Sequence, residues 1–255
     1  MNRIPDYMKL TCDVVAWMCD YCSSNKIKSL VVGVSGGIDS AVSSTLAAKT
    51  GMPVYAVGMP INQNSEQEKL SDAHLFWLKN TYPNVTVLKA DLSEVFGKFI
   101  ETIGNELGME YSVNKMAGAN SRSRLRMVTL YQVAASVDGI VVGTGNKVED
   151  YGVGFYTKYG DGGVDIAPIA DLYKTEVREL GQFMGVIPEI VNAKPTDGLW
   201  DDGRTDEDQI GASYEDLEYA MEYGNGPAVR ILHDFNCKNK HKMLPIPTFN
   251  LVNKK

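Results

Sequence analysis

The chain has 255 residues, of which 44% are hydrophobic and 22% are charged, a composition typical of globular domains. Its formal net charge of −7 repels phosphate backbones, which argues against a general nucleic-acid binder. No stretch approaches the roughly 18 consecutive apolar residues of a membrane span, and residues 1–13 lack the basic and then apolar order of a secretion signal. We therefore expect a soluble, cytoplasmic protein that binds neither membranes nor nucleic acids.

The negative charge is concentrated in one segment. Between Asp197 and Glu222 there are 10 acidic residues and one basic residue, so this segment carries −9 and the remainder of the chain carries +2. A phosphate-bearing ligand is expected in the nearly neutral remainder, where lysines and arginines can complement it. The acidic segment itself is interpreted as a solvated loop and helix face.

The first half of the chain alternates between helical and strand patterns. A helix is predicted over residues 6–24, and the apolar run Ser29–Val34 predicts a buried strand. The elements predicted next are strand 54–59, helix 65–80, strand 85–90, helix 93–107, helix 120–137 and strand 140–142. This alternation predicts an α/β fold, a doubly wound parallel sheet flanked by helices and Rossmann-like in architecture.

The second half is less regular. Residues 144–165 are rich in glycine and have little periodicity, which predicts a long loop of the kind that is often functional. Helices are predicted at 173–184, 206–223 and 228–235, with a loop at 195–205 and a lysine-rich tail at the end. Because no linker or repeat interrupts the chain, we expect residues 1–255 to form a single domain.

The segment Ser35–Ser40 directly follows the first strand and opens the next helix. At such a turn the glycines let the backbone close on an anion, helix N–H groups point outward, and Ser35 and Ser40 add hydroxyl donors. Asp39 would repel a phosphate unless a divalent cation lay between them, so its position indicates Mg²⁺. The alternative is that Asp39 and the serines are simple helix caps.

Two common nucleotide-binding motifs are excluded. No Gly-Lys-Ser/Thr follows the glycines of Ser35–Ser40, so the loop is not that of the P-loop ATPases. Gly143-Thr144-Gly145 follows a predicted strand, but Val148 stands where a dinucleotide-binding fingerprint needs Gly or Ala. Classical kinase, GTPase and Rossmann interpretations are therefore disfavoured.

Residues Gly33–Ser40 resemble the pyrophosphate loop of the N-type ATP pyrophosphatases. Within that superfamily, four further segments occur in the order and spacing of the ammonia-dependent NAD synthetases, namely Arg124–Met127, Gly143–Glu149, Phe155–Gly162 and His241-Lys242. The resemblance covers nearly the whole chain. Between Glu149 and Lys158 the chain is one residue longer than the commonest form of the family, and Gly152–Gly154 are expected to absorb the extra position.

The resemblance implies an amide-forming ligase. The nicotinate carboxylate of deamido-NAD attacks the α-phosphate of ATP, pyrophosphate leaves, and ammonia then displaces AMP from the adenylated intermediate to give NAD. It also implies Mg²⁺ as cofactor, ATP as co-substrate, and a homodimer. There is no room for the glutamine-hydrolysing domain of some NAD synthetases, so free ammonia is the expected nitrogen source.

The roles that the resemblance implies fall on four sets of residues. The ATP contacts are Gly33, Val34, Ser35, Gly36, Gly37, Ile38, Asp39, Ser40, Thr144, Lys174 and Thr196; the deamido-NAD contacts are Arg124, Lys158, Asp165, His241 and Lys242; the Mg²⁺ ligands are Asp39 and Glu149; and the catalytic residues are Asp39, Lys158, Asp161 and Lys174. Taken singly, the lysines could be surface residues, and His241-Lys242 could belong to a mobile basic tail.

Rival interpretations remain open from the residues alone. Another enzyme of the superfamily could amidate GMP-like substrates or thiolate tRNA, but a tRNA enzyme needs a basic surface that this acidic chain lacks. A non-catalytic ATP-binding module would not require Glu149, Lys158 and Lys174 together with Asp39.

The cysteines offer one further alternative. Cys19 and Cys22 could belong to a zinc site with Cys237 or His233, but they are interpreted as thiols on a helix face because they lie within the first predicted helix. His74 is interpreted as a structural or surface residue.

Overall fold

The computed structural model describes residues 3–62, 65–112, 114–196 and 205–249. Four parallel strands form the sheet in the order β3-β2-β1-β4, with bounds Ser29–Gly33 for β1, Val54–Gly58 for β2, Val85–Lys89 for β3 and Gly139–Val142 for β4. Leu30 of β1 pairs with Val54 of β2 on one side and with Ile140 of β4 on the other. The winding direction therefore reverses between β1 and β4, and a crevice beyond the strand ends at such a reversal is the usual ligand site of an open α/β sheet.

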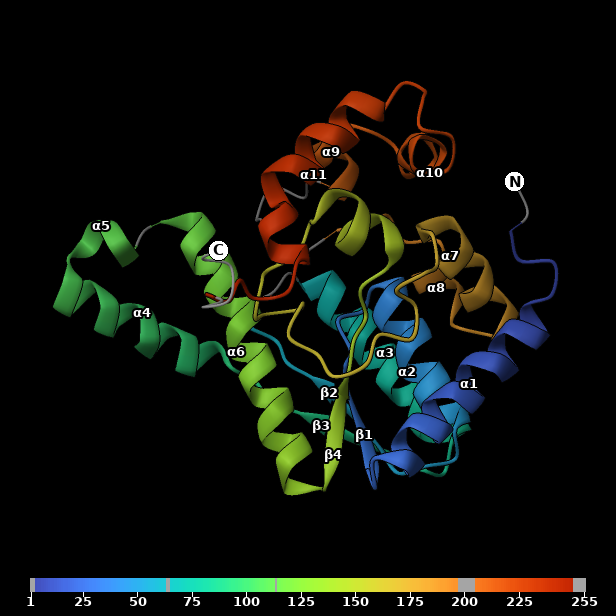
Figure 1. The fold of residues 1–255 in the computed structure, drawn as a ribbon. Coiled ribbons are helices and arrows are strands. Elements are labelled where there is room, and N and C mark those ends of the chain that lie inside the picture. Colours follow the sequence, from blue (N-terminus) through green and yellow to red (C-terminus); the bar gives the residue numbers. More distant parts are fainter. Residues whose placement is uncertain (1–2, 63–64, 113, 197–204, 250–255) are drawn as a thin grey trace.

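The helices occupy most of the rest of the described chain (Figure 1). Their bounds are α1 Tyr7–Ser24, α2 Ile38–Lys49, α3 Ser65–Thr81, α4 Ser93–Leu107, α5 Met109–Ser112, α6 Lys115–Ser136, α7 Lys174–Phe183, α8 Pro188–Val191, α9 Asp206–Ile210, α10 Tyr214–Tyr223 and α11 Val229–Met243, with a π-helix, η1, over Lys147–Val153. The predicted alternation of helices and strands up to residue 142 is confirmed. The short helices α5 and α8 were not expected.

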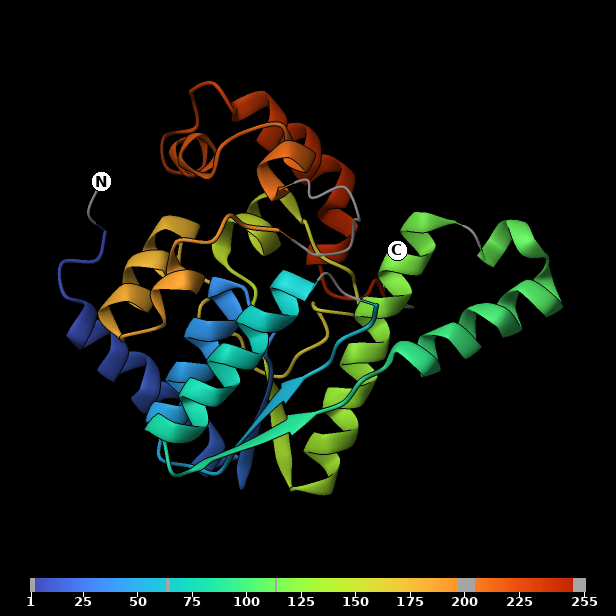
Figure 2. The same ribbon diagram turned by 180° about the vertical axis from the view of Figure 1, so that it is seen from behind.

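Alternate strand residues face opposite sides of the sheet, as strand geometry requires. Leu30 and Val32 lie in a large core formed with α1, α2, α3 and α7. Val31 faces a smaller core, which contains Ala134 of α6. Figures 1 and 2 show α6 on one face of the sheet and α1 to α3 on the other, so the predicted doubly wound α/β architecture is confirmed.

A third cluster of buried apolar side chains lies beyond the carboxyl ends of the strands. Val148 and Val153 of η1 pack there against Tyr214 and Leu217 of α10, and Leu232 of α11 packs at its edge. This cluster joins the C-terminal helices to the segment that follows β4, and Figure 1 shows α11 beside that segment.

The prediction of one helix over residues 206–223 was wrong. The helix stops at Gly211, whose φ of +86° is a left-handed conformation that glycine adopts without strain, and a second helix starts after Ser213. The side chain of Ser213 caps the second helix by accepting a hydrogen bond from Asp216 N.

Part of the predicted lysine-rich tail is also helical. α11 continues to Met243, and its last turn contains Lys240, His241 and Lys242. Cations at this end of a helix interact favourably with the macrodipole, which explains why a basic segment extends the helix.

The glycine-rich segment 144–165 was predicted as a loop but contains η1. The side chain of Asn146 accepts hydrogen bonds from Val148 N and Glu149 N and so starts this element. A π-helical turn has a wider i→i+5 hydrogen-bonding pattern than an α-helical turn, and η1 ends at Gly154 with a φ of +66°. This winding fits the extra residue expected between Glu149 and Lys158.

Three other expectations concern the described residues outside the site. Cys22 is buried in the core and Cys19 Sγ contacts the Thr50 carbonyl, so both are helix-face thiols as interpreted. In the described ranges no cluster of three or more His, Cys, Asp or Glu side chains forms a metal site.

None of the helices described has the length and apolar character to cross a bilayer. Residues 197–204 of the predicted 195–205 loop lie outside the described residues.

Candidate active site

The loop between β1 and α2 has the geometry of an anion-binding turn. Ser35 N donates to Ser40 Oγ at 3.1 Å, and Ser40 Oγ donates to the Gly37 carbonyl at 2.9 Å, which closes the loop on itself. Gly36 has a φ of +88°, and a Cβ there would lie 2.7 Å from the carbonyl oxygen of Gln67. Gly37 is the N-cap of α2 without a side-chain cap, so the helix start presents backbone N–H groups.

Three charged side chains from distant parts of the chain meet beside this loop. Lys174 Nζ, at the start of α7, lies 2.5 Å from Asp39 Oδ2 and 2.8 Å from Glu149 Oε1. The side chain of Lys174 is only 4% exposed, and those of Asp39 and Glu149 are 15% and 16% exposed. The structure therefore brings together three residues that were singled out from sequence.

The charges in this cluster influence one another. Burial opposes the positive charge of Lys174, but the attraction of Asp39 and Glu149 outweighs it and raises the Lys174 pKa. Burial alone would raise the pKa of Glu149, but Lys174 and the hydrogen bond from Tyr214 lower it below its ordinary value. Burial raises the pKa of Asp39. The cluster therefore holds a charged ammonium group between two acidic side chains.

Two residues of this cluster were not predicted from sequence. Asn146 Nδ2 donates to Asp39 Oδ1 at 3.2 Å, and the Tyr214 hydroxyl donates to Glu149 Oε1 at 2.5 Å. Tyr214 belongs to the acidic segment that was interpreted as solvated, yet it is 1% exposed. The acidic residues of α10 are exposed or partly exposed, as interpreted, whereas its other face, with Tyr214 and Leu217, is buried. The sequence signal that could have indicated a buried Tyr214 is an aromatic residue at the first position of a helix made of apolar and acidic residues.

A second group of predicted residues lies in the segment after η1. Asp161 Oδ1 accepts hydrogen bonds from Ser123 Oγ at 2.7 Å and from Thr157 N at 2.9 Å, so α6 fixes this carboxylate. Arg124 Nη2 lies 3.4 Å from the Lys158 carbonyl, and Lys158 Nζ donates to the His241 carbonyl at 3.1 Å. Arg124, Lys158 and His241 are thus neighbours.

The three neighbouring arginines of α6 lie on different sides of the helix, as their spacing of two residues requires. Arg124 is exposed, whereas Arg122 and Arg126 are partly buried on another side of the helix. Arg126 Nε donates to the Met59 carbonyl at 3.0 Å, so at least one arginine faces inward.

Asp165, Thr144 and Thr196 lie around the same edge of the sheet. Asp165 accepts hydrogen bonds from Val141 N at 2.8 Å and from the Tyr131 hydroxyl at 3.0 Å, which holds it at β4. Thr144 follows two residues after the end of β4. The Thr196 carbonyl lies 3.5 Å from Gln67 Nε2, on the helix that approaches Gly36.

Side chains of α11 bind the backbone at the end of η1 and of the residues that follow it. Asn236 donates to the Gly152 carbonyl at 3.0 Å and Asn239 donates to the Val153 carbonyl at 2.8 Å. Lys242 Nζ donates to the carbonyls of Gly154 and Tyr156, the latter at 2.8 Å. Lys242 is therefore anchored on the glycine-rich segment, in contrast to the alternative of a mobile tail.

The donor set suits Mg²⁺. This cation prefers oxygen ligands and is commonly held by one or two carboxylates together with substrate phosphates. Asp39 and Glu149 both reach one point, which the Lys174 ammonium occupies, and the anion-binding turn lies alongside. The residues present therefore fit a cation shared between protein and phosphate.

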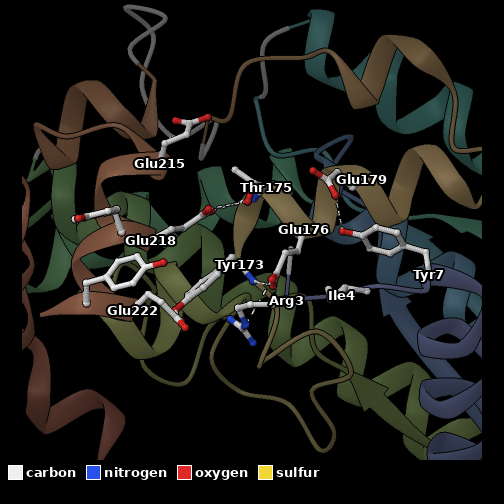
Figure 3. Close-up of a pocket in the computed structure, with 12 residues that line it drawn as sticks. Arg3, Ile4, Tyr7, Tyr173, Thr175, Glu176, Glu179, Glu215, Glu218 and Glu222 are labelled. Atoms are coloured by element: carbon white, nitrogen blue, oxygen red, sulfur yellow. Dashed lines mark hydrogen bonds and ion pairs between the residues drawn. The ribbon is translucent and has the colours of Figure 1, made fainter. Parts of the chain in front are cut away.

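A separate hollow of about 530 Å³ lies behind the start of α7 (Figure 3). Its walls come from the N-terminal segment, α7 and α10, and include Tyr173, Thr175 and Glu218. Tyr173 and Thr175 flank Lys174 in sequence. Within the part of the chain that the structure describes, no candidate site residue from the sequence lines this hollow.

Known proteins similar to this chain indicate the family to which it belongs. A family model described as NAD synthase matches residues 10–241. The chain is 36% identical over 233 residues to the NH(3)-dependent NAD(+) synthetase of Carboxydothermus hydrogenoformans, covering 90% of this chain and 92% of the relative. It is 38% identical over 242 residues to the corresponding protein of Alkaliphilus metalliredigens, covering 92% and 96%.

Solved structures agree with the fold. The NMN synthetase from Francisella tularensis superposes with a TM-score of 0.85 at 30% identity, covering 96% of this chain and 99% of the other. The NH3-dependent NAD synthetase from Campylobacter jejuni superposes with a TM-score of 0.76 at 23% identity, covering 97% and 100%.

Proposed function

This chain belongs to the NAD synthase family, and from that premise we propose how its residues carry out the family's reaction. The activity is that of an ammonia-dependent NAD synthetase, the ATP-dependent amidation of deamido-NAD to NAD. The observation that supports our assignment of residues most strongly is the meeting of Asp39, Glu149 and Lys174 beside the turn Ser35–Ser40.

In the first step, the turn from Gly33 to Ser40 binds the phosphates that leave as pyrophosphate. The backbone N–H groups at the start of α2 face the developing negative charge, and Lys174 adds a buried ammonium group. Asp39 and Glu149 would hold Mg²⁺, and the bound ion would supply neutralising charge to the phosphate oxygens. Thr144 and Thr196 complete the ATP contacts.

Arg124 and Lys158 bind deamido-NAD, the acidic substrate that is adenylated. Their neighbouring positions let a guanidinium and an ammonium group face its phosphates and carboxylate. Asp165, His241 and Lys242 complete this set, and Asp161, held by Ser123, provides an additional active-site carboxylate. Free ammonia is the proposed nitrogen source, and residues 1–255 act as one domain in the cytoplasm.

The direct test is product formation. Purified protein is incubated with ATP, Mg²⁺ and deamido-NAD, with ammonium or glutamine as nitrogen donor, and NAD, AMP and pyrophosphate are measured. We expect equal amounts of the three products with ammonium and no NAD with glutamine. Pyrophosphate without NAD, or no turnover at all, would contradict the assignment.

One observation favours a different acid substrate in place of deamido-NAD. Among the structures compared above, the NMN synthetase from Francisella tularensis superposes better than the NAD synthetase from Campylobacter jejuni. The same chemistry on the nicotinate carboxylate would then convert nicotinate mononucleotide, which lacks the adenylyl half, to NMN. Parallel kcat/KM measurements on deamido-NAD and nicotinate mononucleotide distinguish the two, since the preferred substrate has the larger value.

A homodimer is also proposed. α4 and α5 project from the body with α6 (Figures 1 and 2), and they expose large apolar side chains, among them Val95, Phe99, Leu107 and Met109. Apolar groups gathered on a projecting arm suit burial against a second copy. Light scattering of the wild type and of Phe99→Glu tests this, with a dimer expected only for the wild type.

A further inference from the structure

Three side chains on one face of α10 bind the two segments that carry the charged cluster. Tyr214, Glu218 and Glu222 are spaced by four residues each, so they form a stripe along the helix. Tyr214 contacts Glu149, and the two glutamates contact the residues on either side of Lys174. One helix therefore reaches both the acidic and the basic partner of the cluster.

Tyr214 is in direct contact with the Glu149 carboxylate. Its hydroxyl donates to Glu149 Oε1 at 2.5 Å, the same oxygen that Lys174 approaches to 2.8 Å. The Tyr214 ring also lies 5.2 Å from Lys174 Nζ, in a cation–π contact. A hydrogen bond to a metal-binding carboxylate restricts its orientation.

Glu218 and Glu222 hold the start of α7 (Figure 3). Glu218 accepts hydrogen bonds from Thr175 N at 3.0 Å and from Thr175 Oγ1 at 2.6 Å, and Glu222 accepts one from the Tyr173 hydroxyl at 3.0 Å. A carboxylate at the N-terminal end of a helix also complements the positive end of the helix macrodipole. The residues before and after Lys174 are thus both anchored to α10.

We propose that α10 is a positioning helix for the reaction, in which Tyr214 orients Glu149 and Glu218 and Glu222 set the position of Lys174. The inference rests on the proposed roles of Glu149 and Lys174. These two residues are 25 positions apart in sequence and lie on separate elements, so their separation depends on a third element that touches both. A displacement of about 1 Å in such a group can reduce the rate about 100-fold.

The first test measures cation binding by Tyr214→Phe, which keeps the buried ring and removes only the hydroxyl. Binding of Mn²⁺ is followed by electron paramagnetic resonance in the presence of α,β-methylene-ATP. We expect affinity to fall about 10- to 100-fold. Tyr219→Phe, a half-exposed tyrosine on the same helix, is the matched control and should bind as the wild type does.

The second test separates positioning of Lys174 from general loosening of the fold. Glu218→Ala should lower kcat/KM for ATP by about 10-fold or more and leave the KM for deamido-NAD unchanged. Glu218→Gln should recover most of the loss, since its carbonyl oxygen still accepts from Thr175. Glu215→Ala, on the same helix and lining the same hollow, is the matched control.

The outcomes separate this inference from the function on which it rests. If the wild type binds no Mn²⁺ with the nucleotide, the proposed metal role of Asp39 and Glu149 is wrong, and the positioning role of Tyr214 is wrong with it. If the wild type binds Mn²⁺ and Tyr214→Phe binds equally well, only the positioning role is refuted. Unchanged kinetics in Glu218→Ala, or an equal rise in KM for both substrates, would overturn the role of Glu218.

Discussion

Asp39 and Lys174 are 135 positions apart in sequence, yet Lys174 Nζ lies 2.5 Å from Asp39 Oδ2 in a largely buried ion pair. Glu149 contacts the same ammonium group, so one positive charge serves two acidic side chains. A buried cluster with excess acidic groups has room for additional positive charge, which a divalent cation and the ATP phosphates would provide together.

Asp39→Asn should abolish turnover and leave the protein folded. The amide keeps the shape of the side chain, while Lys174 retains Glu149 as its partner. We expect kcat to fall by at least about 100-fold, since charge stabilisation of the phosphates is lost. Turnover measured over a range of Mg²⁺ concentrations checks this, with the exposed Asp13→Asn as control. Wild-type activity at limiting Mg²⁺ would refute the role of Asp39.

Lys158→Ala should weaken use of deamido-NAD more than use of ATP. A lost charge-assisted hydrogen bond costs about 1.5–3 kcal/mol, which corresponds to a rise in KM of about 10- to 100-fold. Steady-state kinetics with each substrate varied in turn measure both values. Lys240→Ala, an exposed lysine of α11, is the control. A larger effect on ATP than on deamido-NAD would reverse the assignment.

Gly36→Ala should disrupt the anion-binding turn. The φ of +88° disfavours alanine, and the new Cβ would lie 2.7 Å from Gln67 O and 2.8 Å from Ser71 N. We expect a loss of stability of more than about 1 kcal/mol and weaker ATP binding, measured by urea unfolding and calorimetry. Gly51→Ala is a matched control, because Gly51 has a φ of +74° but nothing within 4 Å of its Cβ position. Equal effects on ATP binding in both variants would contradict the prediction.

Lys242→Met should destabilise the protein even without substrates. Lys242 already binds the carbonyls of Gly154 and Tyr156, so removing its ammonium group leaves these acceptors without that donor. The free energy of unfolding should fall by about 1–2 kcal/mol in urea titrations. Lys240→Met, an exposed lysine two positions away on the same helix, should leave it unchanged. An unfolding midpoint equal to that of the wild type would show that the contacts do not stabilise the folded chain.

His74 should make the stability depend on pH between 4 and 6.5. The imidazole is fully buried, stacks on Trp77 at 5.3 Å, and has Nε2 within 3.0 Å of Ser44 Oγ. Burial lowers its pKa from 6.5 to about 4, so the unfolded chain binds this proton more readily than the folded chain does.

The stabilisation from neutral His74 is thus complete above pH 6.5 and is lost progressively as the pH falls toward 4. Between pH 7.5 and pH 5 the loss should be about 2 kcal/mol. Urea unfolding at both pH values measures it, and His74→Gln should remove this part of the difference. If the variant showed the full wild-type dependence, another group would be responsible.

Much of the fold followed from local patterns. The apolar runs Ser29–Val34 and Ile140–Val142 became β1 and β4, since alternating strands and helices specify a parallel sheet. The helix boundaries after residue 143 were less well predicted. Gly211 broke an apparently continuous pattern, and the π-helical winding of Lys147–Val153 has no simple apolar period.

What the sequence by itself determined was the turn Ser35–Ser40, the family, and the identity of the charged residues, because strand-to-helix turns and motif spacing are local properties of the chain. Only the tertiary structure decided that Lys174 lies between Asp39 and Glu149, and that Tyr214 reaches them from the acidic segment. Such contacts arise when distant helices bury apolar faces against each other, as Tyr214 and Val148 do in one cluster. Periodicity states which face of a helix is buried but does not specify the partner against which it packs.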